Sequence, residues 1–401
     1  MSSDLEFRTA TQQDLDRVIA IHGSAFPDPR REPERRRNFL ANPLGTIDDL
    51  WLALDHGEIV GHAFLFRTEA FFGDRPVPTA AIASVGVAPE ARGRGVASGL
   101  LDHLHREAVT RGAAIALLYA FRHAFYGRHG YAPVSTSARW AFAPESGPDA
   151  WLRAFRVADA RAPRAGDTAA LESLYERAAL GKTGWIRRPR ALWDAKWLDE
   201  RNHVVVVGPA DAPRGYALFV YDQVEGHART TIAVEEMVSA DAEARRVLFG
   251  FLAAQRDQVA EVEMELDVDD PIAFALVDPD RRRHGTARVE HTLGTITTGP
   301  MVRILDLDRA LRARGYLYDT RSRVRLGDRA LSLKAAGGVV AIEEVAAVEV
   351  EIDAPFVPSV LFGSLAPSAA AAIDGARGAG SALANADALL GLPRFSAIDR
   401  F

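Results

Sequence analysis

A glycine- and arginine-rich turn is the part of the sequence best suited to holding phosphate. The apolar run at residues 80–87 predicts a buried strand, and residues 92–97 read Arg-Gly-Arg-Gly-Val-Ala, the pattern R-x-x-G-x-A. Apolar side chains then recur at helical spacing: Val96, Leu100, Leu101, Leu104 and Ala108. Such a turn exposes backbone N–H groups, and the helix that follows adds partial positive charge at its first turn.

Two better-known phosphate motifs do not fit this stretch. A dinucleotide fingerprint needs G-x-G-x-x-G, and a P-loop needs Gly-Lys-Ser/Thr, and neither occurs here. Gly95 and Ala97 are small where we expect a ligand to approach the backbone closely. The structural alternative is an ordinary Arg/Gly turn before a helix.

A second stretch, "FRHAFYGRHGYAP" at residues 121–133, carries groups that could move protons. A phenol with a pKa near ~10 is protonated at pH 7 and can donate to a sulfur anion. Tyr126 is the favoured donor, whereas Tyr131 is expected to begin a strand and lie in the core. His123 and His129 are possible bases, because imidazole titrates near neutrality, and Glu90 could act through water. Packing of Tyr126, or a solvated helix end around the histidines, would explain the same residues.

Composition limits the class of protein. The chain has 401 residues, 48% of them hydrophobic, so two or three packed domains are expected. It has no cysteine, which excludes disulfides, thiol nucleophiles and cysteine-bound zinc, and no metal site is expected. There is no apolar run of membrane-spanning length and no signal-peptide pattern. The net charge of −6 argues against nonspecific nucleic-acid binding, so we expect a cytoplasmic protein without a membrane or nucleic-acid partner.

Hydrophobic patterns suggest three consecutive domains. Residues 1–150 predict the order β-α-α-β-β-β-α-β-α-β. Residues 151–298 repeat parts of that pattern: "VSADAEARRVLFGFL" keeps the "EAR" of "VAPEARGRGVASGLL" and its apolar helix face, but lacks the glycines. Residues 299–401 form a third unit with an alternating strand near residues 348–353 and an Ala/Gly-rich helical part.

The glycine turn resembles motif A of the GCN5-related N-acetyltransferases (GNAT), where such a turn holds the pyrophosphate of coenzyme A. Together with the Phe-Tyr segment and the terminal Phe401, essentially the whole chain resembles the Eis (enhanced intracellular survival) family. The resemblance implies an α+β fold made of tandem GNAT folds. The second is expected to be degenerate, and a sterol-carrier-protein-like α/β domain is expected to follow it.

The family's chemistry can be placed on residues of this chain. Backbone N–H groups of the strand before the turn are expected to polarise the thioester carbonyl. The resemblance assigns acetyl-CoA contacts to Val85, Gly86, Val87, Arg92, Gly93, Arg94, Gly95, Val96, Ala97, Phe121 and Arg122. It makes Tyr126 the general acid and the C-terminal carboxylate of Phe401 the general base. A free α-carboxyl titrates near ~3.5, so burial in the cleft would have to raise its pKa.

The acceptor is expected to be a primary amine of an aminoglycoside, a lysine side chain or a polyamine, and the family resemblance implies a hexamer. A polycation favours an acidic cleft, whereas this chain has "RREPERRR" at residues 30–37 in the expected lip and Arg400 next to its end. Both features weaken the aminoglycoside interpretation. Two other classes stay open: a ligand- or lipid-binding protein acting through its C-terminal part, and a regulator whose acetyltransferase fold is vestigial.

Overall fold

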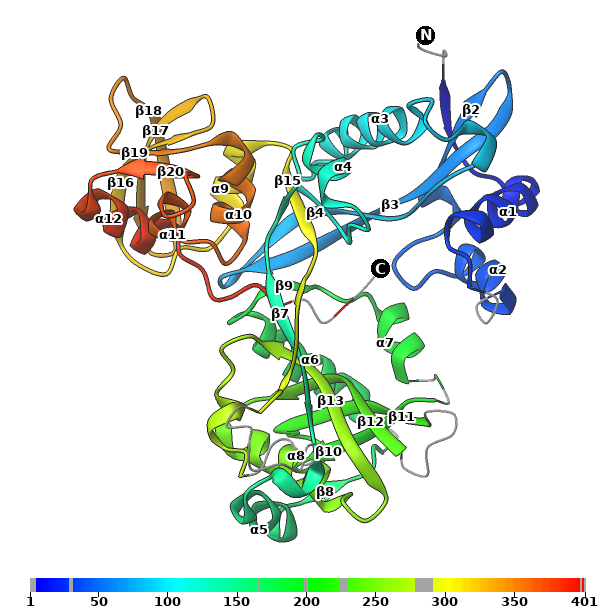
Figure 1. The fold of residues 1–401 in the computed structure, drawn as a ribbon, viewed down its shortest axis with the longest axis vertical. Helices are drawn as coiled ribbons and strands as arrows, with labels where there is room; N and C mark the ends of the chain where they lie inside the picture. Colours follow the sequence, from blue (N-terminus) through cyan, green and yellow to red (C-terminus); the bar gives the residue numbers. More distant parts are fainter. Residues whose placement is uncertain are drawn as a thin grey trace. The chain divides into compact units, whose positions relative to one another are not determined.

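The computed structural model describes residues 5–28, 32–164, 166–197, 199, 201–223, 230–277, 291–396 and 399. The chain forms two compact units (Figure 1). Unit 1 comprises Met1–Ser135, Thr183–Leu192 and Gly299–Phe401, and unit 2 comprises Thr136–Lys182 and Trp193–Thr298. None of the helices in the described ranges is long and apolar enough to cross a lipid bilayer.

The first sheet of unit 1 carries the glycine turn. Its strands, in spatial order, are β1 (Glu6–Thr9), β2 (Leu50–Asp55), β3 (Glu58–Phe72), β4 (Arg75–Val87), β5 (Ile115–Leu118), β15 (Met301–Ile304) and β6 (Ala132–Pro133), with β9 (Thr183–Ile186) paired to the far end of β3. All neighbours are antiparallel except β4 and β5, which are parallel. A parallel pair needs a crossover, and the helix α3 (Val96–Thr110) provides it.

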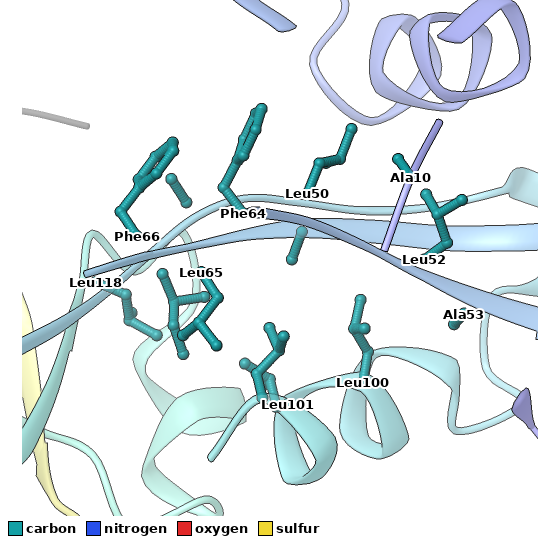
Figure 2. Packing of buried hydrophobic residues seen from close by; sticks show 14 of the residues in the cluster. Ala10, Leu50, Leu52, Ala53, Phe64, Leu65, Phe66, Leu100, Leu101 and Leu118 are labelled. Atoms are coloured by element: carbon teal, nitrogen blue, oxygen red, sulfur yellow. The ribbon is translucent and has the colours of Figure 1, made fainter. Parts of the chain in front are cut away.

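Helices cover both faces of this sheet, which explains why β3 and β4 are apolar almost throughout. Figure 2 shows Leu65 and Leu118 on the side of Leu100 and Leu101, which belong to α3, and Phe64 on the opposite side. The helices α1 (Leu15–Ala25) and α2 (Glu32–Leu40) precede β2, and α1 packs on β3 and β4. The core of the sheet is therefore a layered one, with apolar side chains buried above and below the strands.

The C-terminal part of unit 1 has its own five-stranded sheet. Its strands, in spatial order, are β18 (Val339–Glu344), β17 (Arg329–Ala336), β16 (Thr320–Leu326), β19 (Val350–Ile352) and β20 (Ala376–Gly378). Its helices are α9 (Leu307–Ala313), α10 (Val357–Phe362), α11 (Pro367–Ala371) and α12 (Gly380–Leu390). Its core continues into the first sheet, because Phe72, Val77 and Ile115 belong to the same buried cluster as Leu331 and Phe362.

Unit 2 contains a seven-stranded sheet. Its strands, in spatial order, are β14 (Gly294–Thr298), β7 (Thr136–Phe142), β13 (Val259–Asp267), β12 (Thr230–Ser239), β11 (Gly215–Gln223), β10 (His203–Val207) and β8 (Ala160–Arg161). Its helices are α5 (Asp149–Val157), α6 (Asp167–Ala179) and α8 (Ala242–Ala254), and α7 (Arg190–Trp197) crosses the limit between the units. The strands β12 and β13 are parallel and joined by α8, which repeats the β4-α3-β5 arrangement.

The compact units do not follow the three consecutive ranges 1–150, 151–298 and 299–401. The strand β7, expected to end the first domain, pairs with β13 and β14 in unit 2. Conversely, β15 lies between β5 and β6 of the first sheet, and β9 extends that sheet from the middle of the chain. The places of β7, β9 and β15 depend on pairing between strands that are far apart in the sequence. Local hydrophobic patterns do not predict such pairing.

Candidate active site

The turn after β4 has the open form that an anion requires. Gly93 and Gly95 have φ angles of 78° and 86°, in the left-handed region that favours glycine. A Cβ atom at either position would meet no atom within 4 Å. Gly95 is the N-cap of α3, and no side chain caps this helix. The first-turn N–H groups of α3 are therefore left without a capping side chain, the arrangement with which helix starts bind phosphate.

The equivalent helix of unit 2 begins differently. The Asp241 carboxylate accepts a hydrogen bond from the backbone N–H of Ala244 at 2.8 Å and caps α8. Arg214 forms ion pairs with Asp241 and Glu243 at 3.0 and 2.7 Å. A carboxylate thus occupies the place where the first unit leaves its helix start open.

The two arginines of the turn brace it. Arg92 donates to the carbonyl oxygens of Ser24 and Val87, at 3.0 and 3.4 Å. Arg94 forms an ion pair with Asp55, at the end of β2, at 2.9 Å. Both guanidinium groups therefore hold the turn against neighbouring elements.

The strand β4 is irregular where the thioester carbonyl is expected. Phe64 pairs with Ala83 and His62 pairs with Gly86, so Ser84 and Val85 together oppose a single residue of β3. Ser84 has a φ of 51°, a conformation that is uncommon for a residue other than glycine. This bulge takes backbone groups out of the ladder.

The parallel pair β4 and β5 comes apart next to the bulge. The two strands pair only from Thr79 with Ile115 to Ala81 with Leu117. In the described part of the chain, no strand pairs with residues 82–87 of β4 on that side. The backbone of Val85, Gly86 and Val87 therefore lies where β4 and β5 are no longer paired.

Tyr126 lies in the short helix α4 (His123–Gly127), which follows β5. Its side chain is buried and packs edge-on against Phe121, Phe125 and Tyr131. Burial raises its pKa to about 12, which keeps the phenol protonated at neutral pH. The structure gives its hydroxyl no hydrogen-bond partner among the described residues.

Tyr131 is buried in the core, as expected. Its hydroxyl lies 2.9 Å from Nε2 of His105, and Arg303 contacts the other ring nitrogen of His105 at 3.1 Å. Burial raises the pKa of Tyr131 as well. Of the two tyrosines, Tyr126 is the one whose hydroxyl makes no hydrogen bond to a described residue and could donate one to a substrate.

Two of the alternative bases, His129 and Glu90, already have polar partners. The two ring nitrogens of His129 lie 3.1 Å from the Ser98 hydroxyl and 3.3 Å from the Asp102 carboxylate. Glu90 is 62% exposed, and its hydrogen bond from Arg17 at 2.6 Å lowers its pKa, which weakens it as a base.

The end of the chain reaches the same part of unit 1. Asp399 is buried and forms an ion pair with Arg188 at 2.9 Å. The carbonyl oxygen of Asp399 accepts a hydrogen bond from the hydroxyl of Tyr119, directly after β5, at 2.8 Å. Phe401, the expected base, lies outside the described residues.

Comparisons with known proteins agree with this geometry. Two family models, each described as an acetyltransferase (GNAT) domain, match residues 6–134 and 184–304. The N-acetyltransferase Eis of Mycobacterium tuberculosis (strain ATCC 25177 / H37Ra) is 28% identical over 335 residues, covering 79% of this chain and 78% of that protein. An uncharacterized N-acetyltransferase of Streptomyces avermitilis is 26% identical over 339 residues, covering 78% and 76%.

The chain belongs to the Eis family of GCN5-related N-acetyltransferases. It is therefore an acyltransferase. Solved structures share the fold of this Eis-family enzyme. A GCN5-related N-acetyltransferase from Anabaena variabilis has a TM-score of 0.84 at 20% identity, covering 99% of this chain and 100% of that one. Eis1 from Mycobacterium abscessus has a TM-score of 0.76 at 22% identity, with the same coverage.

In this Eis-family enzyme, the expected contacts Phe121 and Arg122 lie on an exposed surface next to the turn. Arg122, Ala124, Phe125 and Arg128 line a hollow of about 430 Å³, and the guanidinium of Arg128 lies 5.9 Å from the ring centre of Phe125. The contact between His129 and Ser98 places this segment beside the first turn of α3. The hollow offers cations and an aromatic ring close to the open turn.

The arginine-rich segment is less open than the sequence suggested. Arg35 is 7% exposed and donates to the carbonyl oxygens of Phe26 and Asp28 at 2.7 and 3.0 Å. Arg36 pairs with Asp16. Arg30, Arg31 and Arg400 lie outside the described residues. Arg35 therefore holds α2 against the preceding segment, whereas Arg36 stays in a surface ion pair.

Sequence reasoning missed a buried histidine behind the bulge. His62 is fully buried, neither ring nitrogen has a hydrogen-bond partner among the described residues, and its ring packs against His22 and Phe39. A Cβ atom on Gly86 would lie 2.5 Å from Nε2 of His62. Gly86 is thus small because of this ring, a reason that no local pattern indicates.

We expect His62 to make the enzyme labile in acid. Burial lowers its pKa to about 3, below the ordinary value near 6.5. Between these values the unfolded chain binds the extra proton, so stability is complete above pH 6.5 and falls as the pH drops. Between pH 6 and pH 4, the free energy of unfolding of His62→Leu should fall less steeply with decreasing pH than that of wild type. The difference between the two slopes should be about 1.4 kcal/mol per pH unit.

Urea midpoints at pH 7.5, 6.0 and 5.0 measure this difference. The values at pH 7.5 give the packing cost of the substitution, and only the change with pH reports the proton. Parallel pH dependences for wild type and His62→Leu would contradict the assignment.

Proposed function

We propose that this enzyme transfers the acetyl group of acetyl-CoA to a primary amine. The open turn at residues 92–97, at the unpaired end of β4, carries the proposal. Backbone N–H groups of Gly93, Gly95 and Val96 would hold the pyrophosphate, and Arg122 lines the hollow where a further phosphate could lie. The bulge at Ser84 and Val85 would present N–H groups to the thioester carbonyl oxygen.

The transfer itself needs three proton movements. The terminal carboxylate of Phe401 takes one proton from the ammonium, and the resulting amine nitrogen attacks the carbonyl carbon. When the carbon–sulfur bond of the tetrahedral adduct breaks, the departing thiolate takes the hydroxyl proton of Tyr126, and the second nitrogen proton returns the phenolate to a phenol. Phe401 is the second residue after Asp399, so their Cα atoms are at most about 7 Å apart. The anchoring of Asp399 next to β5 supports a carboxylate near this strand.

The acceptor class follows from the family resemblance: aminoglycoside, lysine or polyamine amines. The capped start of α8 supports a second GNAT domain that no longer binds the cofactor. A sterol-carrier-like C-terminal domain, a hexameric assembly and a cytoplasmic location stay predictions.

Release of free CoA in the presence of candidate amines tests the function. The chain has no cysteine, so a thiol reagent detects only the CoA produced. Spermidine, a lysine peptide, an arylamine and an aminoglycoside form the panel. Amine-dependent CoA release and an acetylated product are expected. Tight CoA binding without turnover of any amine would favour a vestigial, ligand-binding role instead.

We expect Tyr126→Phe to lower kcat by about a hundredfold, at the lower end of the range for a positioned general acid. The Kd of CoA should stay unchanged, because in this proposal the hydroxyl acts on the sulfur and makes no contact with the phosphates. Tyr131→Phe is the matched control, because it removes a hydroxyl that His105 contacts. This variant should be less stable, but its kcat should stay close to the wild-type value. An equal loss of turnover in both variants would argue against Tyr126 as the acid.

A further inference from the structure

Phe395 and Ser396, near the end of the chain, lie along β9. Phe395 forms a parallel bridge with Thr183, and the N–H of Ser396 donates to the carbonyl oxygen of Thr183 at 2.8 Å. Nε1–H of Trp185 donates to the Ser396 hydroxyl at 3.3 Å. Gly184, with a φ of 93°, lies so close to the Phe395 ring that a Cβ atom would be 2.5 Å from it. This stretch of the tail therefore has a fixed register on a strand from the middle of the chain.

A buried ion pair secures the tail beyond this strand. Nε of Arg188 lies 3.1 and 2.9 Å from the two carboxylate oxygens of Asp399, and Nη2 lies 2.9 Å from Oδ1. The side chains are only 1% and 3% exposed. Arginine holds a carboxylate in a fixed relative orientation through such paired contacts. A buried charge pair is sensitive to its geometry, because neither charge has water as an alternative partner.

The anchored residue is held from two sides. Arg188 comes from the segment Thr183–Leu192, which joins unit 1 although the chain before and after it belongs to unit 2. Tyr119, at the end of β5, binds the carbonyl oxygen of Asp399 from the sheet. Phe401 follows Asp399 by two residues, so the position of Asp399 keeps the Cα atom of Phe401 within about 7 Å.

We propose that Arg188 is a positioning residue that holds the terminal carboxylate of Phe401 within reach of the acceptor amine, through its ion pair with Asp399. The inference rests on the proposed role of that carboxylate as the base. A general base must lie within hydrogen-bond distance of the proton it takes, and displacement by about 1 Å can cost a hundredfold in rate. Arg188 supplies this precision by fixing Asp399, two residues before Phe401.

Arg188→Met tests the proposal in the full-length enzyme. We expect kcat to fall by about tenfold to a hundredfold, with the Kd of acetyl-CoA unchanged. The acid limb of the pH profile of kcat/KM should move toward the ordinary α-carboxyl pKa of about 3.5 as the tail becomes solvated. Carboxypeptidase should also release the last residues faster. Arg188→Lys should restore part of kcat, because a single ammonium keeps the charge but not the planar fork.

Arg187→Met is the matched control. Arg187 is the neighbouring arginine, 47% exposed, and it pairs with Glu69 at the surface. We expect its kcat, pH profile and carboxypeptidase sensitivity to match wild type. If Arg188→Met does not fold, Asp399→Asn removes the other charge while keeping the shape of the side chain, and the same readouts apply.

The outcomes separate the inference from the proposed function. If an alanine added after Phe401 abolishes turnover while Arg188→Met and Asp399→Asn behave like Arg187→Met, the positioning role is wrong and the terminal base stands. If the added alanine leaves turnover intact, the terminal base itself is wrong, whatever the arginine variants show. A loss of kcat in Arg188→Met without any change in the pH profile or in carboxypeptidase release would reduce Arg188 to a structural residue and overturn the inference.

Discussion

Adding one alanine after Phe401 is expected to reduce kcat by about 10²–10⁴-fold, the range for a positioned general acid or base. The extension turns the carboxylate of Phe401 into an amide, which cannot accept the proton. The new carboxylate lies one residue further along, up to about 3.6 Å away. Because Asp399 remains tied to Arg188 and Tyr119, the tail cannot slide back to compensate.

The same measurement separates a lost base from a disturbed cleft. The Kd of CoA and the melting temperature should not change, since the extension touches neither the turn at residues 92–97 nor the core. One alanine added after Met1 lengthens the chain equally at its other end and should leave kcat at the wild-type value. Full turnover in the C-terminally extended enzyme would remove the terminal carboxylate from the mechanism.

Gly95→Glu is expected to weaken CoA binding by more than about a hundredfold. The substitution places a carboxylate at the start of α3, where we expect the pyrophosphate. Two like charges brought together at a binding site cost several kcal/mol, and each 1.4 kcal/mol is a factor of ten in Kd. The open space over Gly95 means that the side chain meets no protein atom nearby, so the effect should come from the lost anion site.

Gly166→Glu provides the matched control for the backbone strain. Gly166 is also an N-cap in the left-handed region, with a φ of 98° and no atom within 4 Å of its Cβ position. Both variants should carry a similar stability cost of about 1–2 kcal/mol. The CoA-induced rise in melting temperature should vanish only in Gly95→Glu. An undiminished rise in that variant would place the cofactor elsewhere.

The local parts of the site could be predicted because local sequence determines them. The strand, the glycine turn and α3 follow from apolar spacing and from two glycines whose positive φ angles other residues rarely adopt. The core role of Tyr131 also followed from its place at the start of a strand, and the structure confirms it. The left-handed backbone conformation is a reason for glycine at positions 93 and 95; close approach of a ligand to Gly95 stays a prediction.

The non-local parts could not be predicted. Arg188 and Asp399 are 211 residues apart, and an arginine or an aspartate in isolation carries no signal that it is buried. The insertion of β15 between β5 and β6, and the pairing of β9 with β3, likewise depend on which edges remain free after folding. His62 reads as part of an apolar strand, and only the packed structure shows that Gly86 must leave room for its ring.

A crystal structure of the full-length enzyme with CoA and an amine acceptor would test the central claim most directly. We predict pyrophosphate oxygens within hydrogen-bond distance, about 2.7–3.2 Å, of the N–H groups at residues 93–96. The sulfur should lie beside the Tyr126 hydroxyl, and the Phe401 carboxylate should point at the acceptor nitrogen. CoA bound over the capped start of α8, or a terminal carboxylate turned to solvent with the acceptor in place, would contradict the account.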